Sequence, residues 1–134
     1  MKYYMERILQ TDCESAVSIT KEALKKEGFG IVSEIDMTST FKEKLQVDFR
    51  KYKILGACNP ALAHEALQKE DKIGTMLPCN VVIQQFENDK TEVAVVDPLA
   101  SMLAIENENL RELARKVRIK LEKVVSDIPI TLPL

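Results

Sequence analysis

One stripe of apolar residues near the C-terminus constrains the fold more than any other feature of the chain. Its members are Leu110, Leu113, Val117, Leu121, Val124 and Ile128. They recur at steps of three and four residues, a spacing that places side chains on one face of an α-helix. The other faces of this segment are rich in Lys, Arg and Glu. The pattern therefore predicts a long helix that packs on a partner surface with one side only.

Segments of alternating polarity predict a β-sheet as that partner. We expect strands over 2–9, 30–37, 48–58, 81–86 and 91–96, the last two joined by a turn at 87–90. We expect a first helix, opened by a capping box from Thr11 to Glu14 and ended by Gly28. Its inward face is predicted to hold Cys13, Ala16, Val17, Thr20, Ala23 and Leu24. Ser39 or Thr40 can cap a short turn, and Asn59-Pro60 is a strong start for a second helix.

This order of elements predicts an α+β fold with an antiparallel sheet and helices packed on one face. The 134 residues contain no repeat and no interdomain linker, so we expect a single domain over 1–134. A chain of this length can bury about two-thirds of the surface that it exposes when unfolded. It therefore needs neither a disulfide nor a metal to hold its core.

Composition argues against two classes of partner. The 19 basic and 21 acidic residues leave a formal charge of -2, whereas nucleic-acid-binding proteins normally carry a basic excess. No apolar run is long enough to cross a bilayer or to act as a signal peptide, so no membrane partner is expected. Three cysteines without an export signal indicate reduced thiols and a cytoplasmic protein.

Two blocks of the sequence resemble a known family. They are VDFRKYKILGACNPALAHEAL at 47–67 and IGTMLPCNVVI at 73–83. Both resemble the bacterial and archaeal domain-of-unknown-function family 302, and the similarity extends over nearly the whole chain. The resemblance implies a β-α-β4-α two-layer sandwich, similar in outline to half of the TATA-box-binding protein. It implies no reaction, substrate or cofactor.

A repeated dipeptide points to a candidate site. Cys58-Asn59 closes one predicted strand and Cys79-Asn80 opens the next long one. If these strands are antiparallel neighbours, both cysteines lie at the same end of the sheet. Asp97 closes the other arm of the predicted hairpin and reaches that end too, and His64 lies one turn into the helix that Asn59 caps. Cys13, in the first helix, is expected to lie apart from this group.

Three interpretations of this convergence remain open. Cys58 and Cys79 could form a thiol redox pair, helped by a helix N-terminus that lowers a thiol pKa. With His64, they could bind zinc or another thiophilic metal, although their spacing matches no standard zinc motif. They could also be small buried hydrophobic residues, as free cysteines commonly are. His64 alone is equally consistent with a partly exposed helix residue.

The Asn59-Pro60 pair has two readings of its own. The free backbone N–H groups of the helix that it opens could receive an anion, or the pair could serve only as a cap. A basic cluster precedes it, which could draw an acidic ligand or be a solvated surface. Its members are Lys42, Lys44, Arg50, Lys51 and Lys53.

From these features we predict a domain that binds a small molecule or an anion near the N-terminus of the Asn59 helix. The candidate ligand-binding residues are Cys58, Asn59, Pro60, His64, Cys79, Asn80 and Asp97. A thiol or metal-handling protein and a non-catalytic dimeric interaction module are the alternatives. The apolar tail at 127–134, held extended by Pro129 and Pro133, should dock on its own domain or on a neighbour. We therefore expect a homodimer.

Overall fold

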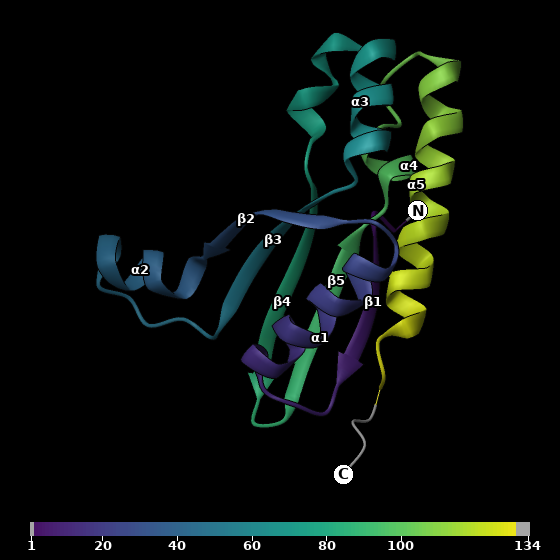
Figure 1. Ribbon diagram of the computed structural model, residues 1–134. Coiled ribbons are helices and arrows are strands. Elements are labelled where there is room, and N and C mark those ends of the chain that lie inside the picture. The colour runs from purple at the N-terminus through teal and green to yellow at the C-terminus, as the bar shows by residue number, and fades with distance from the viewer. Residues whose placement is uncertain (1, 131–134) are drawn as a thin grey trace.

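The structure is a computed structural model, and it describes residues 2–130 of the chain (Figure 1). The strands are β1 (Tyr4–Leu9), β2 (Gly30–Asp36), β3 (Tyr52–Cys58), β4 (Cys79–Glu87) and β5 (Lys90–Val96). The α-helices are α1 (Cys13–Lys26), α2 (Met37–Leu45), α3 (Pro60–Lys69), α4 (Pro98–Ser101) and α5 (Glu108–Asp127). A 3-10 helix, η1 (Asp71–Met76), follows α3. None of the described helices is long and apolar enough to cross a membrane.

The five strands form one antiparallel sheet in the order β1-β5-β4-β3-β2. The predicted hairpin joins β4 to β5 through a tight turn, in which Asp89 takes the left-handed conformation at φ 57°. The order is β-α-β4-α once α2, α3, η1 and α4 are treated as connections. The predicted fold class, an antiparallel sheet with helices packed against it, is therefore confirmed.

Alternate residues of the central strands bury one face of the sheet. Leu55, Val81, Ile83, Val93 and Val95 are each fully buried there. They form one core with α1 and with the C-terminal half of α5. All six residues predicted for the inward face of α1 are buried. Burying each large aliphatic side chain contributes about 1.5–3 kcal/mol, so this covered face holds most of the fold together.

A second, smaller core lies beyond the end of the sheet. It joins α3, η1 and α4 to the N-terminal half of α5, which runs past both cores (Figure 1). Ile73, Leu110 and Leu113 are its most deeply buried members. The apolar stripe of α5 thus serves two clusters, because its helix is longer than the sheet that it covers.

The starts of two helices differ from the predictions. The N-cap of α1 is Asp12 rather than Thr11, because the Thr11 carbonyl accepts a 2.7 Å hydrogen bond from the Thr91 hydroxyl. The short turn expected after Ser39 or Thr40 is the nine-residue helix α2. It begins earlier, because the Asp36 carboxylate caps it by accepting a 3.0 Å hydrogen bond from the Ser39 N–H.

The start of the apolar tail docks on its own domain. Ile128 is fully buried in the main core, and the backbone N–H of Gln10 donates a 3.3 Å hydrogen bond to the carbonyl of Ile130. Leu132 and Leu134 lie outside the described residues. The predicted homodimer thus gains no support from Ile128, and it stays a prediction.

Candidate functional site

The predicted residues meet, in part, at one end of the sheet. Ala57 pairs with Cys79, so Cys58 lies one residue past the partner of Cys79 on the neighbouring strand. Val81 pairs with Val95, which brings Asp97 to the same end. The strand register therefore agrees with the predicted convergence of Cys58, Cys79 and Asp97.

The two thiols at this end are free and differ in burial. Cys58 is half-buried, whereas Cys79 is 8% exposed. Burial, with a smaller contribution from the neighbouring Cys58, raises the pKa of the Cys79 thiol to about 11. Because the thiolate is the reactive form of cysteine, this environment disfavours Cys79 as a nucleophile at neutral pH.

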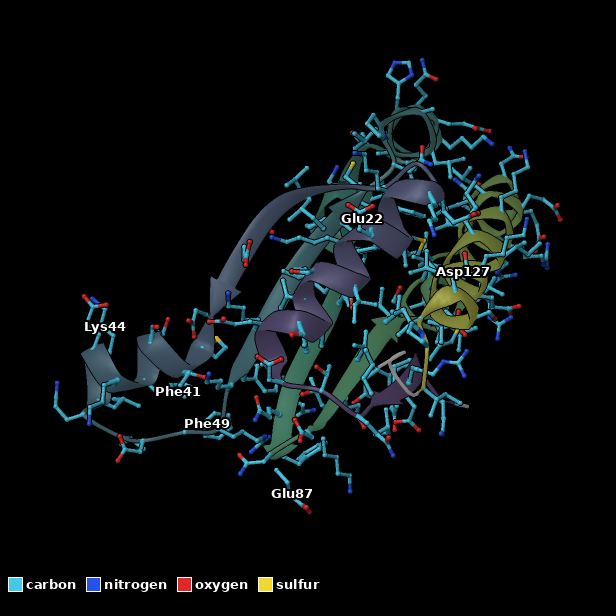
Figure 2. All side chains as sticks on the ribbon, turned by 60° about the horizontal axis from the view of Figure 1, so that its bottom comes forward. Glu22, Phe41, Lys44, Phe49, Glu87 and Asp127 are labelled. Atoms are coloured by element: carbon cyan, nitrogen blue, oxygen red, sulfur yellow. The ribbon has the colours of Figure 1, made fainter. Side chains whose placement is uncertain are left out.

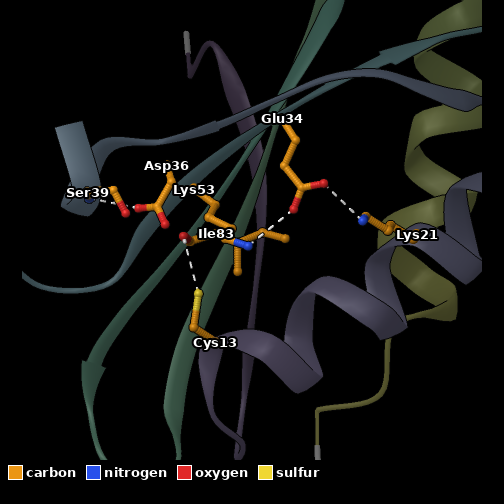
Figure 3. A network of polar contacts seen from close by, with 7 residues as sticks. All are labelled: Cys13, Lys21, Glu34, Asp36, Ser39, Lys53 and Ile83. Atoms are coloured by element: carbon orange, nitrogen blue, oxygen red, sulfur yellow. Dashed lines mark hydrogen bonds and ion pairs between the residues drawn. The ribbon is translucent and has the colours of Figure 1, made fainter.

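Cys13 lies in a different part of the core, as predicted. Its Sγ is 3.9 Å from the carbonyl oxygen of Ile83, which is four residues along β4 from Cys79 (Figure 3). The Cys13 backbone N–H donates a 2.9 Å hydrogen bond to the side-chain oxygen of Gln85. Burial raises the pKa of the Cys13 thiol. Cys13 therefore anchors the first turn of α1 to β4.

Both ends of the Asn59 side chain form hydrogen bonds within the fold. Its side-chain oxygen accepts a 3.3 Å hydrogen bond from the Leu62 N–H, and its amide nitrogen donates to the Glu27 carbonyl at 3.5 Å. Pro60 occupies the first turn of α3, as the sequence predicts. The Asn59 amide also lies over Gly28, whose φ is +84° and where an added Cβ would stand 3.0 Å from the Asn59 Nδ2. These contacts tie the start of α3 to the end of α1.

The remaining predicted residues point elsewhere. His64 is exposed on α3. Asp97 is buried, accepts a 3.0 Å hydrogen bond from the Leu99 N–H, and pairs with Arg118 through a second 3.0 Å contact. Within residues 2–130, no three Asp, Glu, His or Cys side chains form a group that could hold a metal ion. The suggested zinc site of Cys58, His64 and Cys79 is thus not formed. Asn80 is exposed, and it faces the opposite side of the sheet.

A cavity at this end joins the two thiols to residues that the sequence analysis missed. The volume within which the centre of a water molecule can move is about 40 Å³. The walls of the cavity are almost entirely apolar. Cys58 and Cys79 line it from the sheet, whereas Ala63 and Ala114 line it from α3 and α5. The cavity separates the two cores, since its walls include members of both. Small residues on two packed helices were the signal for it, since they leave space where larger side chains would meet.

Comparison with known proteins agrees with the resemblance that the sequence suggested. A search of curated proteins finds no match. The crystal structure of an uncharacterized conserved DUF302 protein from Bacillus stearothermophilus superposes with a TM-score of 0.88 at 26% identity, and the match covers 96% of this chain and all of that chain. The family model for the domain of unknown function DUF302 matches residues 5–128. The chain therefore belongs to the DUF302 family.

Proposed function

We propose that this domain binds a small apolar molecule in the cavity between its two cores. The observation that carries the proposal is the position of the cavity, at the boundary between two separately packed clusters. Binding sites are typically concave and mostly apolar, with few polar groups. Here Asn59, Cys58 and Cys79 are the only polar or thiol side chains among the lining residues.

The nature of the walls selects the ligand class. A charged ligand would lose its hydration without gaining a partner, because both ends of the Asn59 side chain are already hydrogen-bonded. An anion at the start of α3, one of the two readings of the sequence, is therefore disfavoured. The two thiols suit apolar contacts, since sulfur is polarisable and Cys79 is neutral near pH 7. The best match is a single small ring or a short branched hydrocarbon group.

The size of the cavity supports the same class. A cavity needs roughly 10–15 Å³ of space for water centres to hold one water molecule, so about 40 Å³ accommodates a group larger than a single water. Apolar cavities in proteins can take up small apolar molecules such as benzene. We therefore choose benzene as the probe, with thermal unfolding as the readout.

The test fills the cavity from one wall. Ala63→Leu places a larger side chain in the cavity, and Ala61→Leu makes the same change at an exposed position two residues earlier on α3. A ligand that binds only the folded state raises the unfolding temperature. Benzene should therefore stabilise the native protein and the Ala61→Leu variant, and should leave the Ala63→Leu variant unchanged. Equal stabilisation of both variants would place the benzene elsewhere and overturn the proposal.

A further inference from the structure

The face of the sheet turned away from α1 and α5 carries a second surface, here called the open face. No helix of residues 2–130 lies over its centre (Figures 1 and 2). A row of apolar residues crosses it from strand to strand, through Ile35, Ile54, Val82 and Ala94. The row ends at Glu6 of β1, the partner of Ala94. Val82 and Ala94 of this row also line a hollow of about 410 Å³, whose other lining residues include Tyr4 of β1 and Tyr52 of β3.

The second unusual region is the arm, defined here as residues 37–51. It consists of α2 and the segment that leads into β3, and it projects from the rest of the molecule (Figure 1). No residue of α2 is buried. Leu45, Val47 and Phe49 are 61%, 49% and 37% exposed. A nine-residue helix is marginal in water without tertiary packing, so the arm lacks the contacts that usually stabilise such an element.

The arm and the open face form one continuous surface. Phe41 and Phe49 stack edge to face with their ring centroids 5.2 Å apart, and Phe49 lies 6.1 Å from Tyr52 of the open face. The guanidinium group of Arg50 lies 4.4 Å from the centre of the Phe49 ring. Figure 2 shows Phe41 and Phe49 at the base of the arm, with Lys44 further out.

Charges of both signs lie along this surface, and Gln84 links two of them within one copy, because it accepts a 2.9 Å hydrogen bond from Arg50 and donates one of 3.2 Å to Glu92. The arm carries Lys42, Lys44, Arg50 and Lys51 against the two acidic residues Glu43 and Asp48. The open face carries Glu92 on β5 and Glu6 on β1, and Glu6 pairs with Lys2 at 3.2 Å. Partial burial, together with the neighbouring Glu6, raises the pKa of the Glu92 carboxyl. Lys2 pairs with Glu6 rather than with Glu92, so a cation brought from outside would still stabilise the Glu92 carboxylate.

We propose that a second copy of this chain covers the open face, so that the arm of each copy lies over the open face of the other. A two-fold interface needs one surface that is complementary to itself. This surface meets that requirement, because the basic, aromatic arm of each copy would face Glu92 and the apolar row on the open face of the other copy. The arm then gains the apolar partner that its own domain does not provide.

The first test places a charge in the middle of the open face. Ala94→Arg adds a side chain that points to solvent in a single copy, so the fold should survive, as circular dichroism can verify. Sedimentation of the native protein at tens of micromolar should give twice the 15.2 kDa chain mass, and Ala94→Arg should halve that mass. Ala61→Arg, at an exposed position of α3, should leave the mass unchanged. A monomeric native protein, or a dimer that survives Ala94→Arg, overturns the proposal.

A second test reverses the charges in two separate copies. Lys44→Glu alone and Glu92→Arg alone each place like charges at both contacts of the two-fold interface, so each variant should sediment as a monomer. In a mixture, one contact is native and the other is reversed on both sides, so a dimer should reappear. This recovery requires contacts between copies, because no repair within one chain could follow from mixing. A mixture that stays monomeric contradicts the proposed pairing of arm and open face.

Discussion

The helices α1 and α2 both carry apolar, hydroxyl and charged side chains, but their surroundings differ. Six of the 14 residues of α1 are buried, whereas none of the nine residues of α2 is. α1 lies on the covered face of the sheet, where its apolar side completes the main core. α2 extends from the end of β2 without reaching either core (Figure 1). Helix formation in this protein therefore has two causes, burial for α1 and local contacts for α2.

Local polar contacts at both ends define α2. Asp36 caps its N-terminus, and Gln46 closes its C-terminus in the left-handed conformation at φ 55°. The Thr38 hydroxyl donates a 2.7 Å hydrogen bond to the Arg50 carbonyl and accepts one of 2.9 Å from the Tyr52 N–H. A capping bond typically contributes only about 1 kcal/mol, far less than the burial of several aliphatic side chains. α2 should therefore open more easily than α1.

The largest expected difference between the two helices is the loss of unfolding free energy when a leucine in the last turn of each is replaced by alanine. Leu24 of α1 is fully buried, whereas Leu45 of α2 is 61% exposed. Leu24→Ala should lower the free energy of unfolding by about 2–5 kcal/mol, because it leaves a cavity in the core. Leu45→Ala should change it by less than about 0.5 kcal/mol. Urea unfolding of both variants, in the Ala94→Arg background that excludes a second copy, gives the two values. Equal losses would show that the arm is part of the cooperative core.

Burial should also slow the chemistry of a thiol on the covered face. The pKa of Cys79 is raised from 9.0 to about 11, so its thiolate fraction near pH 8 is about a hundredfold below that of an ordinary thiol. Alkylation by iodoacetamide should therefore be slower by about that factor than at a cysteine introduced at an exposed position of α3 by Ala61→Cys. The rate at Cys79 should rise with pH up to about 11. Mass spectrometry of the separate peptides resolves the sites, and rapid labelling of Cys79 at pH 8 would revive the thiol redox hypothesis.

The space around two glycines differs between an inner strand of the sheet, β3, and its edge strand, β2. A Cβ added at Gly56 would lie 2.1 Å from the Ser33 Oγ and 2.7 Å from the Pro78 Cγ. At Gly30, where β2 begins, an added Cβ meets no atom within 4 Å. Gly56→Ala should lower the free energy of unfolding by about 1–3 kcal/mol through overpacking, whereas Gly30→Ala should be neutral or slightly stabilising. Urea unfolding measures both, and a tolerated Gly56→Ala would mean that Ser33 and Pro78 can move aside.

The sequence predicted the elements that burial defines more reliably than those that local contacts define. The periodicity of Leu110 to Ile128 predicted α5, because each apolar residue faces a core. The start of α2 was misplaced, because Asp36 had been assigned to a strand and its capping role depends on the backbone after it. Boundaries of this kind depend on single hydrogen bonds, which periodicity does not reveal.

The candidate site was predictable only as far as strand pairing allowed. The antiparallel register brought Cys58, Cys79 and Asp97 to one end of the sheet, as the order of elements suggested. The sequence did not reveal that Arg118 pairs with Asp97, since 21 residues separate them. The open face was hidden for a related reason. Half-buried positions such as Val82 and Ala94 alternate with fully buried ones, so the sequence reads as a strand buried on both sides.

The smallest expected effect concerns Glu34, a carboxylate that links β2 to α1. Glu34 of β2 pairs with Lys21 of α1 at 3.1 Å and with Lys53 of β3 at 3.2 Å (Figure 3). The hydrogen bonds from Lys21 and then Lys53 hold the pKa of Glu34 below its ordinary value of 4.5. A lowered pKa stabilises the fold above the unfolded-state value, and this stabilisation is lost as the pH falls through the folded-state value.

Glu34→Gln should therefore lower the free energy of unfolding at pH 7 and have almost no effect near pH 3. The loss at pH 7 should be below about 1 kcal/mol, because the Glu34 side chain is 37% exposed and water screens its ion pairs. Glu22→Gln, at an exposed position on α1, is the matched control and should show neither the loss nor its pH dependence. Urea unfolding at both pH values tests this. A loss that persists at pH 3 would have to come from packing rather than charge, and it would mean that β2 is held to α1 more firmly than its exposed surface indicates.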